Sequence, residues 1–233
     1  GLQAIIKIAG ADTRVLTISD LVFKIGPRIN AAGRIKSGEK AVNLLTTDNF
    51  DLAMEMSREI NQFNTIRKDL DHNITEEALA LIEKSEIDDE KKTTVVFNKE
   101  WHKGVIGIVA SRLTESYYRP TVVLTESHGL ATGSARSVMG FDLYEAISQC
   151  SDLLEAYGGH KYAAGLTLKI ENVEPFIQKF EKVVSGIINP EQLIPQVEID
   201  AIIRFKDITP KFYRILKQFA PFGPENMKPV FMT

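Results

Sequence analysis

Cysteine, tryptophan and histidine are scarce in this chain of 233 residues. The single cysteine, Cys150, excludes an internal disulfide and a zinc site built from several cysteines. Its place in an apolar, helix-like stretch predicts a buried thiol rather than a nucleophile, and one reduced thiol is typical of a cytoplasmic protein. The four histidines lack the helical two-histidine spacing of a zinc motif; they are His72, His102, His128 and His160.

Long apolar runs, a secretory leader and a large excess of either charge are also missing. No run approaches the ~20 apolar residues of a membrane helix, so we expect no membrane partner. The formal net charge of −3 excludes a surface that is positive throughout. Any site for a polyanion must therefore be a local cluster of arginine and lysine. No glycine-rich nucleotide loop followed by Lys-Ser or Lys-Thr is present.

The N-terminal third of the chain is predicted to be helical. It begins without methionine inside a predicted helix at 2–8, which indicates a piece of a longer protein. Residues 39–84 carry apolar side chains at helical spacing. With Asp48 as its cap, a helix to residue 83 would span about 50 Å, unless a second helix begins near Thr75. Such a helix suits a connector between two lobes, and the acidic run 86–90 suits a solvated linker.

The pattern then changes to alternating strands and helices. Strands are predicted at 93–97, 120–124, 130–137 and 163–170, and helices at 105–117, 141–157 and 173–187. The order βαββαβα predicts an α/β domain with a mixed sheet. Beyond the prolines near 190 and 195, we expect a strand at 197–205, a helix at 210–219, a turn at 221–224 and a strand at 230–232. This last unit is smaller than a domain that usually folds alone, so we interpret it as truncated.

One candidate site combines a polar strand with a glycine pair. Ser134 and Arg136 lie two residues apart on a predicted strand, so they share a face. Arginine offers a planar fork for two phosphate oxygens, and Ser134 and Ser137 offer hydroxyl groups. The alternative is a surface arginine paired with a carboxylate such as Asp142.

The glycine pair, Gly158 and Gly159, is predicted to form a turn that brings backbone N–H groups and His160 to a ligand. A helix C-cap is the alternative.

The segment 101–112 is a second candidate. His102 and Lys103 precede a helix whose first N–H groups favour an anion. Trp101 either stacks on a base or is buried in an interface, and Arg112 is predicted to be structural or part of an ion pair.

Arg28, Asn30 and Arg34 occupy a predicted loop between Gly26-Pro27 and Gly33. Such a loop suits contacts to a nucleic-acid backbone, and an interface loop is the alternative.

Four segments together resemble the RecJ group of single-strand-specific exonucleases in the DHH phosphoesterase superfamily. They read FKIGPRINAAGR at 23–34, WHKGVIGIVASR at 101–112, GSARS at 133–137 with GFDL at 140–143, and GGHKYAAG at 158–165. PFGPEN at 221–226 resembles the group's turn in the following domain. The resemblance implies the end of a DHH catalytic domain at 1–47, a connector helix and linker at 48–90, a DHHA1 domain at 91–188 and the start of an OB-type domain at 189–233.

The resemblance also implies roles for the candidate residues. Ser134 and Arg136 would hold the terminal phosphate, His160 the strand, and His102 the substrate near the metal ions. The group's Mn²⁺ or Mg²⁺ is held by aspartates and histidines whose motifs are not found in this sequence. Asp71-His72 is not the Asp-His-His signature and is predicted to lie on a solvated helix surface. We therefore expect neither catalytic nor metal-binding residues, and no hydrolysis by this piece alone.

The predicted function is the nucleic-acid-binding part of a single-stranded-DNA-specific 5′→3′ exonuclease in DNA repair and recombination. Its expected partners are single-stranded DNA and the missing N-terminal catalytic lobe in cis. Two alternatives remain. One is a DHH-family phosphodiesterase for oligoribonucleotides or cyclic dinucleotides, which would lack the unit after residue 195. The other is a non-enzymatic nucleic-acid-binding module, because DHHA1 domains also resemble the tail of alanyl-tRNA synthetases.

Overall fold

The computed structural model describes residues 1–11, 16–84 and 91–233. The chain forms two units, Gly1–Ile194 and Pro195–Thr233, and each is described by itself. The acidic run predicted as a linker at 86–90 lies outside the described residues.

The N-terminal part consists of short helices that precede the long helix α5 (Phe50–Lys84). The short helices are α1 (Leu2–Ile8), α2 (Ile18–Asp20), the π-turn η1 (Leu21–Ile25), α3 (Gly26–Ile35) and α4 (Glu39–Thr46). Of these, α1, α3 and α4 pack against α5. The loop predicted around Arg28 and Arg34 was wrong, because these residues lie in α3. Pro27 is the second residue of α3 and directly follows the π-turn η1 and Gly26. Ala31 and Ala32 face the buried cluster there.

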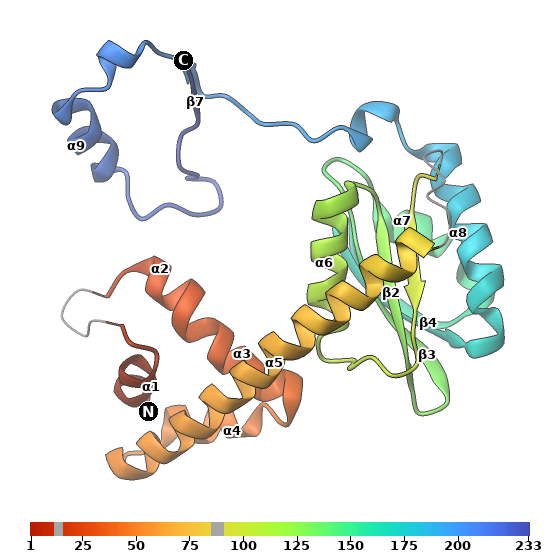
Figure 1. Ribbon diagram of the computed structural model, residues 1–233, viewed down its shortest axis with the longest axis horizontal. Coiled ribbons are helices and arrows are strands. Elements are labelled where there is room, and N and C mark those ends of the chain that lie inside the picture. Colours follow the sequence, from red (N-terminus) through yellow and green to blue (C-terminus); the bar gives the residue numbers. More distant parts are fainter. Residues whose placement is uncertain (12–15, 85–90) are drawn as a thin grey trace. The chain divides into compact units, whose positions relative to one another are not determined.

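Helix α5 is one uninterrupted helix of 35 residues, which confirms the predicted long helix without a second start near Thr75. The side chain of Asn49, rather than that of Asp48, accepts a hydrogen bond from the N–H of Leu52 at its first turn. The first half of α5 packs in one apolar cluster through Ile60 and Phe63, and the second half packs in another through Ile74 and Ile82. The helix therefore belongs to two cores (Figure 1). Across the described residues, no helix combines the length and apolar character needed to cross a membrane.

The second half of this unit is a five-stranded mixed sheet with helices on both faces. Its elements are β1 (Thr94–Phe97), α6 (Ile106–Tyr117), β2 (Thr121–Ser127), β3 (Leu130–Arg136), α7 (Leu143–Ser148), β4 (Leu154–His160), β5 (Ala163–Lys169) and α8 (Val173–Ile187). The strand order is β1-β2-β3-β5-β4, with β1 parallel to β2 and the other pairs antiparallel. The predicted mixed α/β domain is confirmed.

The helix predicted over 141–157 was wrong in its second half. Helix α7 ends at Ser148, a 3₁₀ turn (η2) covers Ser151–Leu153, and β4 follows as an edge strand. The order is therefore βαββαββα. Leu143, Ile147 and Leu154 mimic one helical stripe, but Leu154 packs against the core from the start of the strand. The rest of β4 is polar or small and exposed, so it lacks the alternation that marks a half-buried strand.

The two faces of the sheet are covered differently. Helices α7 and α8 cover one face, where Phe176 and Phe180 stack with ring centroids 5.5 Å apart. Helix α6 covers the other face over β2 and β3, and the end of α5 reaches β1 there. Cys150 is fully buried on the α7–α8 side, as predicted, and burial raises the pKa of its thiol to about 11.

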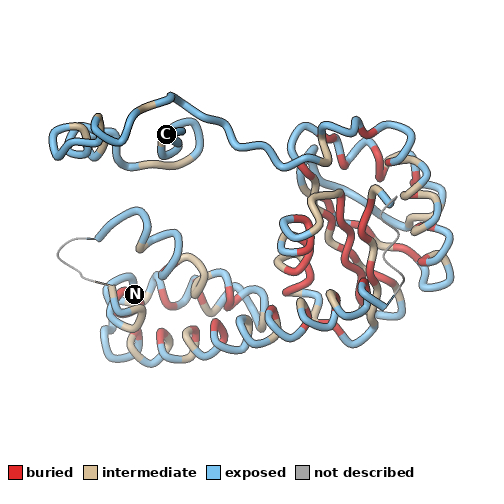
Figure 2. The backbone as a smooth tube through the Cα atoms, turned by 45° about the horizontal axis from the view of Figure 1, so that its top comes forward, coloured by how far each residue is buried: buried red, intermediate tan, exposed pale blue. Residues whose placement is uncertain are grey.

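The C-terminal unit has little regular structure. It holds β6 (Ala201–Ile202) and β7 (Phe231–Met232), which pair in parallel, and α9 (Pro210–Gln218). The strand predicted over 197–205 is limited to β6. No residue of 195–233, all of which is described, is buried (Figure 2). A segment of this size buries too little apolar surface to form an ordinary core.

Candidate nucleic-acid interface

The polar residues predicted on β3 lie on the sheet face that α6 only partly covers. Ser134 and Arg136 point to the α6 side, because a Cβ added to Gly107 of α6 would lie 3.0 Å from Ser134 Oγ and 3.3 Å from Arg136 Nη2. Ala135, between them, is buried against the opposite core. The side-chain alternation of a strand therefore places both functional groups together, as the sequence predicts.

The register extends this face across β5 to β4. Arg136 pairs with Ala163, which pairs with His160. Ser134 pairs with Gly165, which pairs with Gly158. Because directly paired residues point to the same face, His160 and Gly158 lie on the face of Arg136 and Ser134. Two sequence segments separated by α7 therefore form one surface.

The glycine pair is thus part of a strand and not the predicted turn or helix cap. Gly159 has φ +152°, and a Cβ there would lie 2.3 Å from the carbonyl oxygen of Ala163, so the close pairing of β4 and β5 requires glycine. Gly158 has no such restriction: a Cβ there would have nothing within 4 Å. Its bare backbone leaves the sheet face open.

Arg136 is held by neutral groups. Its Nε donates to Ser111 Oγ at 3.2 Å, and its Nη1 donates to Ser134 Oγ at 3.2 Å and to the Ala135 carbonyl oxygen at 2.8 Å. Among the described residues it has no carboxylate partner, and Asp142 instead caps α7 by accepting from the N–H of Glu145. The predicted alternative of an Arg136–Asp142 pair is therefore not observed. Burial, and then the charge of Arg34, lowers the pKa of the Arg136 guanidinium.

Arginines from four elements gather beside this face. Arg34 (α3) acts electrostatically on both Arg136 (β3) and Arg67 (α5), and Arg112 (α6) also acts on Arg67. The buried carboxylate of Asp71 offsets part of this charge. Arg34 Nη1 donates to the Gly104 carbonyl oxygen at 3.0 Å, which joins α3 to the segment before α6. The net charge of the chain is negative, so a site for a polyanion has to be a local cluster of cations. These arginines form such a cluster.

His160 and His102 both offer a ring nitrogen for donation. His160 Nδ1 accepts from the N–H of Tyr162 at 3.3 Å, and His102 Nδ1 accepts from the N–H of Gly104 at 3.1 Å. In the neutral ring the proton then resides on Nε2, which can donate to an oxygen of a ligand. Donation from Nε2 to a ligand therefore does not need a charged ring in either histidine.

Other predicted site residues have structural partners or lie apart. Arg28 Nε donates to Asn61 Oδ1 at 2.9 Å, which ties α3 to α5. Asn30 is exposed on α3. Ser137 Oγ donates to the Phe141 carbonyl oxygen at 2.9 Å. Lys103 Nζ lies 3.5 Å from Ser127 Oγ at the β2–β3 hairpin.

Trp101 is buried and its indole N–H donates to Glu77 Oε2 at 2.8 Å, so the interface alternative holds.

Asp71 was wrongly predicted to be solvated. Its side chain accepts hydrogen bonds from Arg112 and is 2% exposed as a residue, whereas the neighbouring His72 is exposed as predicted. Arg112 makes the predicted ion pair.

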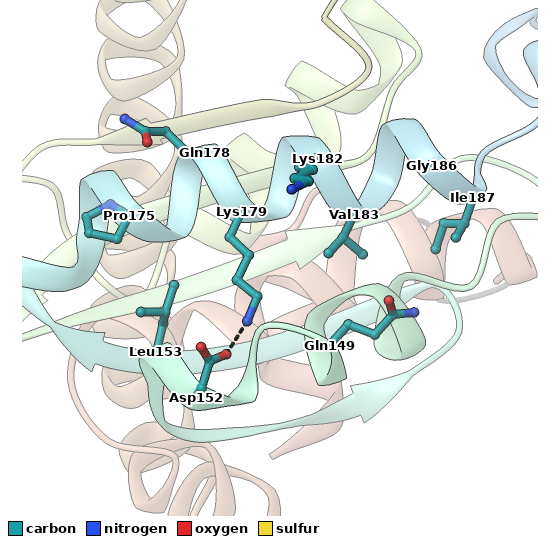
Figure 3. A pocket seen from close by; sticks show the side chains of 10 residues that line it. All are labelled: Gln149, Asp152, Leu153, Pro175, Gln178, Lys179, Lys182, Val183, Gly186 and Ile187. Carbon is teal, nitrogen blue, oxygen red and sulfur yellow. Dashed lines mark hydrogen bonds and ion pairs between the residues drawn. The ribbon is translucent and has the colours of Figure 1, made fainter.

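A groove lies on the opposite side of the sheet, the side of α7 and α8. It has a volume of about 820 Å³ between α8 and the α7–η2 segment, with Leu153, Val183 and Ile187 as its apolar wall (Figure 3). Lys179 pairs with Asp152 across it (Figure 3). The cations that line this groove are lysines, whereas the β3–β5–β4 face carries an arginine and a histidine.

The described residues contain no group of three or more His, Cys, Asp and Glu side chains placed to hold a metal ion. The described residues therefore do not fit a divalent-metal centre.

Comparison with known families defines the class of protein. Residues 90–186 match the DHHA1 domain and residues 199–233 match the RecJ OB domain. A chain with this pair of domains and an arginine-rich sheet face is a DHHA1-domain protein with an appended OB segment.

Similar proteins narrow the class. Single-stranded-DNA-specific exonuclease RecJ of Bacillus subtilis is 38% identical over 98% of this chain, and that of Escherichia coli is 33% identical over 99%. The crystal structure of RecJ in complex with Mg²⁺ from Thermus thermophilus superposes with a TM-score of 0.86, at 30% identity over 99% of this chain. A structure of exonuclease RecJ bound to manganese gives 0.69 over 81%, at 32% identity. The chain belongs to the RecJ family.

The match covers only part of each relative. This chain spans 29% of the Bacillus subtilis protein, 41% of the Escherichia coli protein and 35% of the Thermus thermophilus structure.

Several contributors to this surface were not predicted from the sequence. Gly107 and Ser111 come from α6, Arg67 from α5, and Thr132 and Thr167 from the middle of their strands. No local sequence pattern marks these residues, because each one joins the surface only through its tertiary contacts. Gly165 is exposed on the open face, whereas its neighbour Ala164 packs in the core.

Proposed function

We propose that this chain forms the wall that holds the 5′ end of the strand in a single-stranded-DNA-specific exonuclease of DNA repair and recombination. The observation that carries the proposal is Arg136. It is partly buried, fixed by two serine hydroxyls and a carbonyl oxygen, and unpaired with any described carboxylate. His160 lies in the same row across β5, and Gly158 lies in the neighbouring row on the same face. A fixed guanidinium without an anion is prepared for a phosphate.

The residues would divide the work as follows. Arg136 binds two oxygens of the terminal phosphate, and Ser134 adds a hydroxyl donor. His160 donates from Nε2 to the phosphate or stacks on a base. Arg34 and His102, at the junction of α3 and α6, contact the strand on the side that faces the catalytic lobe. Arg28, Asn30, Ser137 and Lys103 are assigned lesser roles because their contacts are structural or lie at the edge.

Hydrolysis itself is proposed to occur outside this chain. The relatives include RecJ structures with Mg²⁺ and Mn²⁺, and those ions would supply the activated water and stabilise the leaving oxygen. The residues described here offer no metal site, so the intact enzyme would need the rest of the RecJ chain in cis. The chain alone is predicted to bind DNA without cleaving it, and to act in the cytoplasm.

The RecJ OB match at 199–233 favours an exonuclease over a small-substrate phosphodiesterase. An OB segment suits a single strand longer than a dinucleotide. We propose functional divisions at 1–47, 48–90, 91–188 and 189–233, with α5 setting the gap between the lobes.

The test is fluorescence-anisotropy binding of residues 1–233 to single-stranded DNA, with and without a 5′ phosphate, across a salt series. Affinity should depend on the phosphate and decrease with salt. Arg136→Ala should weaken binding of the phosphorylated strand by about 1.5–3 kcal/mol. Lys182→Ala, on the opposite face of the sheet, is the matched control and should bind normally. Equal affinity of Arg136→Ala and the unaltered chain would refute the assignment.

A further inference from the structure

The α6 side of the sheet continues beyond Ser134 and Arg136 into an uncharged depression. Thr132 pairs with Thr167, which pairs with Ala156. This row lies one side-chain repeat, roughly 6.8 Å, from the row of Ser134, Gly165 and Gly158. The depression has a volume of about 370 Å³, and its lining residues include both threonines, Ala156 and the two glycines. The volume is within the range of small-molecule sites.

The floor of this depression is bare although packing does not require it. A Cβ at Gly165 would meet nothing nearer than the Gly133 carbonyl oxygen at 3.8 Å, and one at Gly158 would have open space. Neither residue has positive φ. A Cβ would therefore fit at both positions, and most residues with one are favoured over glycine in a strand. Their absence keeps the backbone open to a flat group.

The rim of the depression is polar but neutral. The hydroxyls of Thr132 and Thr167 line it on neighbouring strands, and no carboxylate or ammonium group is among the lining residues. The cation, Arg136, lies at one end of this floor. A ligand that fits would carry a phosphate beside Arg136 and a flat, uncharged group on the glycine floor. A nucleotide has both parts.

We infer that the 5′-terminal nucleoside lies on the floor of Gly158 and Gly165, with Thr132 and Thr167 at the polar edge of its base. This inference rests on the proposed function, because it places the nucleoside whose phosphate Arg136 holds. A threonine hydroxyl both donates and accepts, so it can pair with the polar edge of any base. The subsite therefore retains the terminal nucleotide without selecting its sequence.

The test compares ligands that differ only in the base. Isothermal titration of residues 1–233 would use dAMP, dTMP, deoxyribose 5-phosphate and inorganic phosphate. We expect dAMP and dTMP to bind at least about tenfold more tightly than deoxyribose 5-phosphate, and within about threefold of each other.

Gly165→Val should reduce dAMP affinity to that of deoxyribose 5-phosphate and leave phosphate binding intact. Thr167→Val, which keeps the shape and removes the hydroxyl, should weaken dAMP binding a few-fold.

The outcomes separate this inference from the proposed function. If dAMP binds no more tightly than deoxyribose 5-phosphate while Arg136→Ala still abolishes both, the nucleoside subsite is refuted and the phosphate site stands. If inorganic phosphate and all three sugar phosphates fail to bind, the phosphate site is refuted and the subsite with it. Circular dichroism of Gly165→Val checks folding, and Thr167→Val gives an independent test.

Discussion

Asp71 of α5 accepts two hydrogen bonds from Arg112 of α6, each 2.8 Å long, one on each carboxylate oxygen. The same carboxylate lies 3.6 Å from Arg67 Nη1. The Asp71 hydrogen bond raises the pKa of the Arg112 guanidinium. This bidentate pair joins the connector helix to the helix that packs beside the candidate phosphate site.

Loss of this pair should destabilise the protein. Arg112→Met leaves the buried Asp71 carboxylate with one longer contact, so we expect the free energy of unfolding to decrease by about 2–3 kcal/mol in urea titration. The exposed neighbour provides the control: His72→Ala should change stability by less than about 0.5 kcal/mol. In the double variant with Asp71→Asn, the loss should be smaller than the sum of the single losses. Strict additivity would contradict the coupling.

We expect Gly107 to be required for affinity for a 5′-phosphorylated oligonucleotide and not for the formation of α6. In Gly107→Ala the new Cβ would press on Ser134 Oγ at 3.0 Å and on Arg136 Nη2 at 3.3 Å, so both groups must shift. We expect affinity for a 5′-phosphorylated oligonucleotide to decrease about tenfold. Gly186→Ala in α8 is the matched control, because its Cβ would have nothing within 4 Å. It should increase stability by about 0.5–1 kcal/mol and bind normally. Unaltered binding by Gly107→Ala would contradict the contact.

Arg136 should contribute measurably to the salt dependence of binding. Removing one phosphate contact on a single strand lowers the slope of log K against log salt by about 0.7. We expect this change for Arg136→Ala in anisotropy titrations between low and physiological salt. A weaker affinity with an unchanged slope would mean that Arg136 supports the fold and does not contact a phosphate.

Glu181 of α8 should make stability depend on acid. Its carboxylate accepts from the N–H groups of Lys92 and Thr93, each at 2.9 Å, and from the Thr93 hydroxyl. Burial alone would raise its pKa, but hydrogen bonds from Thr93, Lys92 and Ser185 outweigh burial and lower the pKa below the ordinary 4.5. A lowered pKa in the folded state gives stability that is present above 4.5 and is lost as the pH decreases through the folded value.

Glu181→Gln should therefore cost about 2 kcal/mol at pH 7, and the difference from the unaltered chain should shrink as the pH decreases below 4.5. Urea unfolding at several pH values measures both. A pH-independent difference would indicate a packing effect instead.

Cys150 should react only when the protein opens. Burial raises the pKa of its thiol to about 11, so little thiolate exists at pH 8 and reagents have no access to it. We expect iodoacetamide labelling, followed by mass spectrometry, to be slow in buffer and rapid in denaturing urea. Labelling of the folded chain at the rate of a free thiol would show that this core opens readily.

The sequence predicted most of the fold where periodicity is strong. The stripe along α5 has a helical period, β1 is a short β-branched and aromatic run, and β5 alternates between buried and more exposed residues. The missed strand, β4, has the opposite property, because its side chains after Leu154 are exposed and two are glycines. Helix α3 was missed because Gly26, Pro27 and Gly33 are typical of loops, and only its packing against α5 outweighs that preference.

The site was predictable in its chemistry and not in its assembly. The spacing of Ser134 and Arg136 on one strand was enough to predict their common face. The position of His160 beside them depends on the register of β5 between two antiparallel neighbours, which no local pattern contains. The gathering of Arg34, Arg67, Arg112 and Arg136 from four elements is likewise a property of packing.

Helix α6 makes two hydrogen-bonded contacts within two turns: Ser111 accepts from Arg136 of β3, and Arg112 donates to Asp71 of α5. Because one helix makes both contacts, we expect them to be favourably coupled, and such coupling acts equally in both directions. A strand end bound at Arg136 should thus tighten the connector against the sheet and slow amide hydrogen exchange near Asp71. Under the proposed function, the contact between α5 and the sheet would then be firmest while a DNA end is bound.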